Sequence, residues 1–388
     1  MHMKHPSRIP FGQLAILAMD NCRELGEKVN RHVVERRKQY WSEQEQYQDF
    51  YLNEIKDNYL VEVQSVRFAN GEGKAVINET VRGKDIYIIS DVGNYSCTYK
   101  MFGLETHMGP DEHFQDIKRT ISAIGGKDRR ITVIMPFLYA GRQHKRRSRE
   151  SLDCAIALQE LERLGVANII TFDAHDPRVA NAVPLIDFQT IHPTYDIIKS
   201  IYYHENKLIT DNENSMIISP DTGAMDRAIY YSSMLGIDVG LFYKRRDYTR
   251  IVNGKNPIVQ HEYMGADLTG KNVIIVDDMA ASGESIIDIA KELKRRNAGD
   301  IYAAVTFGLF TEGVEEFNRC YEQGLIKRFF STNLTYIPDC VRNAEWFVEV
   351  DLSRLIATLI DRLNYDESIR SLLTATEKIK ELLGTDSE

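Results

Sequence analysis

Short apolar runs rich in β-branched residues alternate with helical segments along most of the chain. Three copies of a strand–helix–strand unit span residues 131–175, 216–246 and 272–308. Strands that are apolar throughout are typical of parallel sheets, because such strands are buried on both faces. The pattern therefore predicts an α/β protein with mostly parallel sheets flanked by helices.

The helices of these units have recognisable ends and faces. In the first unit we expect a helix over 151–165, closed by Gly165. Its apolar stripe is predicted to consist of Leu152, Ile156, Leu161 and Leu164. In the second unit Gly236 is expected to end a helix that starts near residue 224.

The segment 33–60 has a different pattern. It lacks glycine and proline, contains charges of both signs and has aromatic residues at intervals. We interpret it as an amphipathic helical insertion of about 33–60 that lies on the surface.

Polar and charged residues follow the predicted strands where plain turns would have Gly, Asn or Ser. Ligands of parallel α/β sheets bind outside the carboxyl ends of the strands, so these residues are candidates for a site. They are Asp173, His175, Asp221, Lys244, Arg246, Asp277 and Asp278.

Length and composition limit the classes of protein to consider. The chain has 388 residues, 43% of them hydrophobic and 27% charged, which indicates a globular protein of two or three domains. The net charge of −9 argues against a protein that coats nucleic acid or anionic membranes. No apolar run approaches the roughly 20 residues of a membrane span. Five widely spaced cysteines and no signal-peptide pattern favour a cytoplasmic protein with reduced thiols.

The strongest local signal is 273-VIIVDDMAASGES-285. A buried strand ends in Asp277 and Asp278, and two adjacent carboxylates are tolerated where a cation or hydroxyl donors share them. Ribose hydroxyls meet that need. The loop that follows, with Ser282, Gly283 and Ser285, offers hydroxyls, backbone N–H groups and a helix N-terminus to a phosphate. The alternative interpretation is purely structural: an exposed turn that caps the helix without binding a ligand.

Two other stretches fit nucleotide chemistry. Phe68, Asn70 and Glu72 combine an aromatic ring with an amide and a carboxylate, a set suited to a nucleobase, although a β-turn at Asn70-Gly71 explains the same residues. The loop 139–149 is the most basic of the chain, and a solvated or nucleic-acid-binding run remains the alternative.

The segment 273–285 resembles the phosphoribosyl pyrophosphate (PRPP) signature of the type I phosphoribosyltransferase fold. Over about residues 60–370 the chain resembles the ribose-phosphate pyrophosphokinase family. This resemblance implies two tandem phosphoribosyltransferase-like, Rossmann-type domains. We expect an N-terminal domain over 1–190, a C-terminal domain over 191–340 and a helical segment over 341–388.

The resemblance also implies roles for individual residues. Phe68, Asn70, Glu72, Arg142, Gln143 and His175 correspond to ATP-binding positions. Asp277, Asp278, Ser282, Gly283 and Ser285 correspond to the ribose 5-phosphate site. His175 and Asp221 would hold Mg²⁺ with support from Asp173, where a helix cap is the alternative for Asp221. Lys244 and Arg246 match the family's catalytic Lys-x-Arg loop, followed by a flap with a hairpin over 247–270; the alternative is a solvated basic strand end.

The expected reaction transfers the pyrophosphoryl group of MgATP to the C1 hydroxyl of ribose 5-phosphate, giving PRPP and AMP. The resemblance further implies a homo-oligomer built from dimers, with hexamers as the larger form, and no nucleic-acid partner. The chain departs from the family at His144, Ala281 and Glu284. Two alternatives stay open, a phosphoribosyltransferase that consumes PRPP and a catalytically weak regulatory homologue.

Overall fold

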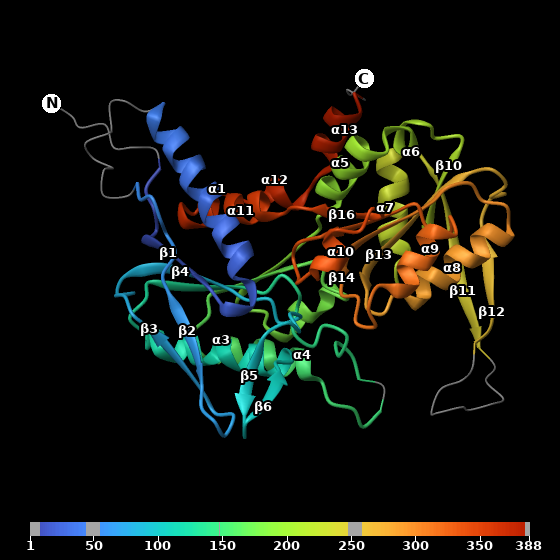
Figure 1. Ribbon diagram of the computed structural model, residues 1–388. Coiled ribbons are helices and arrows are strands. Elements are labelled where there is room, and N and C mark those ends of the chain that lie inside the picture. Colours follow the sequence, from blue (N-terminus) through green and yellow to red (C-terminus); the bar gives the residue numbers. More distant parts are fainter. Residues whose placement is uncertain (1–7, 44–54, 147, 247–257, 385–388) are drawn as a thin grey trace. The chain divides into compact units, whose positions relative to one another are not determined.

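The computed structural model describes residues 8–43, 55–146, 148–246 and 258–384, and it contains two compact units (Figure 1). Unit 1 comprises Met1–His192, Leu334–Tyr336 and Leu352–Thr374. Unit 2 comprises Pro193–Asn333, Ile337–Asp351 and Ala375–Glu388. The expected fold class is confirmed, because both units have parallel sheets with helices.

Unit 1 is built on a five-stranded parallel sheet of order β1-β4-β7-β8-β9. Its strands are β1 (Gln13–Ala18), β4 (Lys84–Ile89), β7 (Arg130–Ile134), β8 (Asn168–Phe172) and β9 (Asp187–Ile191). All six residues of β4 are buried, as expected of a central strand covered on both faces. The sequence pattern did not identify β1, whose six residues are preceded by a segment without a clear period.

The helices and two small hairpins complete unit 1. The helices are α1 (Arg23–Ser42), α3 (Pro110–Ile124), α4 (Asp153–Arg163), α11 (Ser353–Asn364) and α12 (Arg370–Leu373), with 3₁₀ turns η1 (Asp20–Cys22) and η3 (Pro177–Ala182). The hairpins pair β2 (Val63–Arg67) with β3 (Gly73–Ile77) and β5 (Thr98–Met101) with β6 (Leu104–His107).

The predicted helix over 33–60 needs correction. Helix α1 begins ten residues earlier, at Arg23, and ends at Ser42, while residues 55–60 are not helical. The predicted stretch 44–54 lies outside the described residues. The helix is not a surface insertion either, because it buries Leu25, Val29, Val33 and Trp41 and packs against α11.

A buried cluster of charges explains why α1 reads as a surface helix in the sequence. Asp361 of α11 is fully buried and accepts hydrogen bonds from Arg8, Arg36 and Arg37 at 2.8–2.9 Å. Arg37, also buried, donates a further bond to Asn364 at 2.7 Å. Charged residues of this kind are tolerated inside a protein because each finds a partner.

The stripe predicted for the helix at 151–165 is also wrong in part. Helix α4 buries Cys154, Ala157, Leu158 and Leu161. Ile156 and Leu164, assigned to the stripe, are 50% and 40% exposed. The actual buried face is thus rotated towards the small residues Cys154 and Ala157, which permit closer packing.

Unit 2 has a seven-stranded sheet of order β12-β11-β10-β13-β14-β15-β16. Its strands are β10 (Ser215–Ser219), β11 (Asp238–Arg246), β12 (Ile258–Met264), β13 (Asn272–Ala280), β14 (Ile301–Gly308), β15 (Arg328–Thr332) and β16 (Phe347–Val350). All pairs are parallel except β11 with β12. This antiparallel pair forms a hairpin whose first strand is β11 itself, so of the hairpin expected within 247–270 only the strand β12 is seen. Residues 247–257 lie outside the described residues.

Helices α5 (Thr194–His204), α6 (Asn206–Thr210), α7 (Met225–Leu235), α8 (Glu284–Arg295), α9 (Glu315–Glu322), α10 (Asp339–Arg342) and α13 (Thr376–Leu383) complete unit 2. As predicted, Gly236 ends α7 in the left-handed conformation, with φ of 65°. The core includes an aromatic group in which Phe317 of α9 stacks on Trp346, with ring centroids 5.3 Å apart.

The C-terminal segment expected over 341–388 is divided between the two units. Residues 352–374, with α11 and α12, belong to unit 1, whereas 375–388 belong to unit 2. The prediction of a helical segment is wrong for residues 347–350, which form strand β16 of the unit 2 sheet. The sequence pattern also does not show which core each amphipathic helix joins.

Candidate active site

The sheet of unit 2 has a point where its strand order reverses. Strand β10 pairs with β11 on one side and with β13 on the other, so the chain leaves β10 in one direction and later returns on its opposite side. The loops after β10 and β13 lead into α7 and α8. In open α/β sheets a ligand binds in the crevice at such a point, outside the carboxyl ends of the strands.

Asp277 and Asp278 lie near the carboxyl end of β13, next to this point. Asp278 is 6% exposed, and its backbone N–H donates to Asp277 Oδ1 at 2.8 Å. Burial and the neighbouring Asp278 raise the pKa of Asp277 above its ordinary value, while Arg227 acts in the opposite direction. The Arg227 Nη1 atom on α7 lies 3.9 Å from Asp277 Oδ1. Asp278 is buried and Asp277 partly buried, so the pair favours a ligand that supplies hydrogen-bond donors or positive charge.

The loop after β13 brings backbone N–H groups to the start of α8. Gly283 precedes the helix with φ of 83°, a conformation that favours glycine. A Cβ atom on Gly283 would lie 2.1 Å from the ring of Phe317. The backbone N–H of Glu284 contacts Ser282 Oγ at 3.4 Å, and Glu284 itself is exposed in the first helical turn. The loop is therefore held close to the core, as a phosphate-binding turn requires.

Asp221 occupies the loop between β10 and α7. Its Oδ1 atom accepts hydrogen bonds from the backbone N–H groups of Gly223 and Ala224, at 2.8 and 3.2 Å. The carboxylate thus stabilises the turn into the helix, in line with the alternative of a capping role, and it is exposed. A role in metal binding remains a prediction.

Lys244 and Arg246 lie at the end of β11, the strand next to β10. Their backbone positions pair with His261 and Ile258 of β12, and the register shifts between Arg245 and Arg246. The side chains of 244–246 lie outside the described residues. The backbone nevertheless places both positions at the same edge of the sheet as Asp221 and Asp277.

In unit 1 the proposed adenine-binding residues form the turn of the β2–β3 hairpin. Asn70 Nδ2 donates to Glu72 Oε2 at 2.9 Å, and Asn70 Oδ1 accepts from the Glu72 N–H at 3.1 Å. Gly71 has φ of 90°. These contacts agree with the turn that the sequence also allowed, while Phe68 is 49% exposed. An exposed aromatic side chain at a tight turn is available to stack on a ligand.

The basic loop and the segment after β8 meet at His144. Its Nε2 lies 3.4 Å from Asp176 Oδ2, and its ring centroid lies 5.3 Å from that of His175. His175, Gln143 and Arg142 are exposed. The departure at His144 thus has a structural partner in Asp176, whose pKa the hydrogen bonds from Arg178 lower to about 2.

Asp173 has a structural contact of its own. It is 3% exposed, has φ of 43°, and its Oδ1 accepts a hydrogen bond from His192 Nδ1 at 3.0 Å. Within the described ranges, no three or more His, Cys, Asp or Glu side chains form a metal site. Of the predicted metal ligands, His175 and Asp173 belong to unit 1 and Asp221 to unit 2. Carboxylates are the ligands that Mg²⁺ prefers, so a role of Asp221 in binding it stays a prediction.

Sequence reasoning missed Arg227, which lies six residues after Asp221 in the segment 219-SPDTGAMDR-227. Its position in the sequence could have identified it as a site residue. Arg227 lies in the first turn of the helix that follows the Asp221 loop, where a side chain faces the neighbouring strand end. No helix in the described part of the chain is long and apolar enough to cross a membrane. The five cysteines are free thiols.

Comparison with known proteins agrees with this geometry. Residues 14–165 match the model for the N-terminal domain of ribose phosphate pyrophosphokinase, and 187–319 match a phosphoribosyl transferase domain. Ribose-phosphate pyrophosphokinase 1 of Candida albicans is 28% identical over 79% of this chain and 87% of its own. The Staphylococcus saprophyticus enzyme is 26% identical over 79% and 87%.

Among solved structures, phosphoribosylpyrophosphate synthetase from Mycobacterium smegmatis has the same fold. The TM-score is 0.69 at 20% identity, with 90% of this chain and 98% of the other covered. The fold and the strand-end carboxylates thus define a tandem phosphoribosyltransferase-type enzyme. Two matched domains in the order of that family, together with relatives aligned over most of their length, make the assignment specific. The chain belongs to the ribose-phosphate pyrophosphokinase family.

Proposed function

We propose that the protein transfers the pyrophosphoryl group of ATP to ribose 5-phosphate, giving PRPP and AMP. The observation that supports this most is the pair of adjacent carboxylates, the buried Asp278 and the partly buried Asp277, beside a glycine turn at the reversal point of the unit 2 sheet. A phosphorylated sugar needs both parts, hydrogen-bond acceptors for its hydroxyls and N–H donors for its phosphate.

In this proposal each end of ribose 5-phosphate has its own binding group. Asp277 and Asp278 accept hydrogen bonds from the ribose hydroxyls. Ser282, Gly283 and Ser285 bind the 5-phosphate with hydroxyl and backbone N–H donors at the start of α8. This arrangement fixes the C1 hydroxyl, and a fixed nucleophile removes much of the entropic cost of reaching the transition state.

The C1 oxygen then attacks the β-phosphorus of ATP. A bond forms between these two atoms, the bond from the β-phosphorus to the α–β bridging oxygen breaks, and AMP leaves with that oxygen. The C1 hydroxyl gives up its proton to the solvent. Lys244 and Arg246 stabilise the negative charge that develops on the transferred phosphates, as cations do in phosphoryl transfer generally.

Magnesium fits the donor set, because carboxylates follow two neighbouring strands and such hard oxygen ligands suit this ion. Asp221 would hold an ion near the sugar and His175 the ion of MgATP, and magnesium would neutralise the triphosphate and polarise the β-phosphorus. Phe68, Asn70 and Glu72 would bind the adenine, and Arg142 and Gln143 the remainder of ATP.

The same proposal includes the oligomeric state, the cellular location and the partners of the enzyme. From the family resemblance we infer a homo-oligomer based on dimers and a cytoplasmic location, and five free thiols are compatible with that location. Nucleic acid is not a partner in this proposal, in line with the net charge of −9.

Phosphorus NMR of purified protein with ATP, ribose 5-phosphate and Mg²⁺ tests the reaction. We expect AMP and PRPP in a one-to-one ratio, with no free phosphate. Consumption of PRPP with a nucleobase in the absence of ATP would instead identify a phosphoribosyltransferase. Substrate binding without any product would identify a regulatory homologue.

A further inference from the structure

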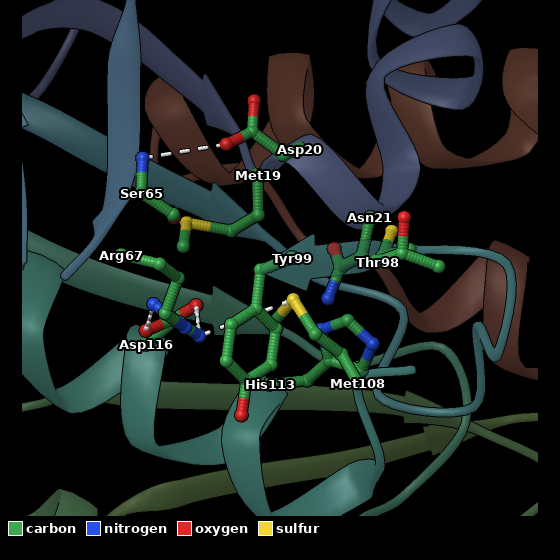
Figure 2. A pocket seen from close by; sticks show the side chains of 11 residues that line it. Met19, Asp20, Asn21, Ser65, Arg67, Thr98, Tyr99, Met108, His113 and Asp116 are labelled. Atoms are coloured by element: carbon green, nitrogen blue, oxygen red, sulfur yellow. Dashed lines mark hydrogen bonds and ion pairs between the residues drawn. The ribbon is translucent and has the colours of Figure 1, made fainter. Parts of the chain in front are cut away.

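Unit 1 contains a cavity that the proposed reaction does not use (Figure 2). Its volume is about 340 Å³, and it lies between the carboxyl end of β1, strand β2, strand β5 and the first half of α3. None of the predicted ATP, ribose or metal residues lines it. Its volume is at the small end of the range of ligand sites, which begins at about 300 Å³.

The charges in the cavity wall are already paired. Arg67 donates two hydrogen bonds to Asp116, at 2.9 and 2.5 Å, and Arg119 donates a third at 2.7 Å. Asp116 is 3% exposed. Because this ion cluster is satisfied within the protein, it does not call for a charged ligand.

The rest of the cavity wall includes thioether and aromatic side chains. Met19 and Met108 contribute thioethers, and Tyr99 contributes a ring whose centroid lies 5.5 Å from the Arg67 guanidinium carbon. Figure 2 shows the Tyr99 ring between Met108 and the Arg67–Asp116 pair. Thioethers and aromatic rings make favourable contacts with flat π-systems.

His113 supplies the polar group that points to a ligand. Its side chain is 98% buried, and its Nε2–H donates to the Asn94 carbonyl at 2.7 Å. Burial lowers the pKa of His113, so the ring is neutral at ordinary pH and Nδ1 is an acceptor. No described residue donates a hydrogen bond to Nδ1. Because the His113 ring lines the cavity, its Nδ1 acceptor is available to a hydrogen-bond donor on a bound molecule.

We propose that this cavity binds a neutral, flat heterocycle of purine size whose ring N–H donates to His113 Nδ1. The bases of purine compounds combine the size, the flat face and the donor that these walls require. Binding here is separate from the ATP and ribose 5-phosphate sites.

The position of the cavity gives the ligand a regulatory effect. Arg67 directly precedes Phe68, and a Cβ atom on Gly73 would lie 2.4 Å from Arg119 Nη1 and 2.6 Å from Arg67 Nη1. On the β5–β6 hairpin the Phe102 N–H donates to the Ala69 carbonyl at 2.9 Å. The cavity walls therefore also support the turn 68–72. A bound heterocycle stiffens that turn and lowers the KM for ATP, an effect that rests on the proposed function, whereas the binding itself does not.

Calorimetric titration of the full chain with free adenine, in the presence of saturating ATP and Mg²⁺ but without ribose 5-phosphate, tests the binding. We expect one adenine per chain. Ser65 lies on the same face of β2 as Arg67, so Ser65→Phe fills the cavity and should weaken binding at least tenfold. Gln64→Phe, on the exposed face of the same strand, should bind as the wild type does.

His113→Phe keeps the ring volume, removes the acceptor and should also weaken binding about tenfold, the usual effect of one lost hydrogen bond. Absence of adenine binding, its loss when ATP is present, or equal affinity in the wild type and Ser65→Phe would overturn the proposal. Adenine binding without any change in the KM for ATP would overturn only the regulatory step.

Discussion

Asp91 shows how one residue can make stability depend on pH. It is 2% exposed at the end of β4 and accepts hydrogen bonds from Gly93 N–H, Thr335 Oγ1 and Tyr336 N–H at 2.8–3.2 Å. Burial raises the pKa of Asp91 to about 7. The folded protein therefore binds a proton that the unfolded chain has already lost, at pH values between about 4 and 7.

We predict that this residue makes the free energy of unfolding fall as pH rises from about 4 to 7, and that Asp91→Asn removes that part of the slope. A pKa difference of one unit corresponds to about 1.4 kcal/mol, so the effect amounts to a few kcal/mol. Urea unfolding of both proteins at several pH values measures it. Parallel profiles for wild type and variant would contradict the assignment.

Gly283 is the residue on which the geometry of the phosphate loop depends most. Gly283→Ala adds a Cβ in the left-handed region and against the Phe317 ring. We expect a loss of about 2–4 kcal/mol in unfolding free energy, from backbone strain and overpacking together. Ribose 5-phosphate affinity should fall more than tenfold.

Gly270→Ala is the matched control for that substitution. Gly270 has φ of 75°, and a Cβ there would meet nothing within 4 Å. Gly270→Ala should therefore lower the free energy of unfolding only by the backbone contribution of about 1 kcal/mol. Its affinity for ribose 5-phosphate should be unchanged. Chemical denaturation and calorimetry compare the two. Equal losses in both variants would mean that Phe317 does not constrain the loop.

At the scale of elements, α1 lies close against β1. A Cβ atom on Gly26 would lie 2.2 Å from Ala18 Cβ. Alanine is the better helix former by about 1 kcal/mol, so propensity alone predicts that Gly26→Ala stabilises the protein. We predict the opposite, a net loss of about 1–3 kcal/mol, because packing overlap outweighs propensity.

Adding Ala18→Gly to Gly26→Ala removes the opposing Cβ and should restore most of the loss. Unfolding of the two single variants and the double variant forms a double-mutant cycle. Additive effects in that cycle would show that the helix and the strand do not meet at these two residues.

The β11–β12 hairpin carries the proposed catalytic cations at its start. Lys244→Ala should lower kcat at least a hundredfold while leaving ribose 5-phosphate affinity nearly unchanged, because the cation acts on charge that develops in the transition state. Lys271→Ala, at the amino end of β13, serves as the control. Steady-state kinetics and calorimetry separate the effects. Equal losses in turnover and affinity would rule out the assigned role.

The elements differ in how far the sequence reveals them. The strand at 273–276 and the helix at 284–295 follow from an apolar run and a clear period, since both pack against one core. Helix α1 was misplaced because its buried face includes Arg37, whose partner Asp361 is 324 residues away. A buried ion pair looks like two surface charges until the fold brings its members together.

At the scale of the whole molecule, the sequence pattern indicated two α/β units and the strand ends of the site. It did not indicate that residues 334–336 and 352–374 return to unit 1, where Thr335 and Tyr336 contact Asp91. Nor did it indicate Arg227 beside Asp277. Each of these contacts depends on tertiary packing between segments that share no local period.

The two units also differ in topology, and this bears on where substrates bind. The order β1-β4-β7-β8-β9 runs in one direction without reversal, whereas the unit 2 sheet reverses between β10 and β13. Only the latter arrangement opens a crevice between two neighbouring loops at the strand ends. The central claim is therefore that ribose 5-phosphate binds at the reversal point of unit 2.

The most direct test measures ribose 5-phosphate affinity and AMP formation for Asp278→Asn and for Asp300→Asn. Asp300 lies beside the amino end of β14, at the opposite edge of the same sheet, in an exposed ion pair with Lys327. We predict that Asp278→Asn loses binding at least tenfold and forms almost no AMP, while Asp300→Asn matches the wild type. Undiminished binding and AMP formation by Asp278→Asn would contradict the account.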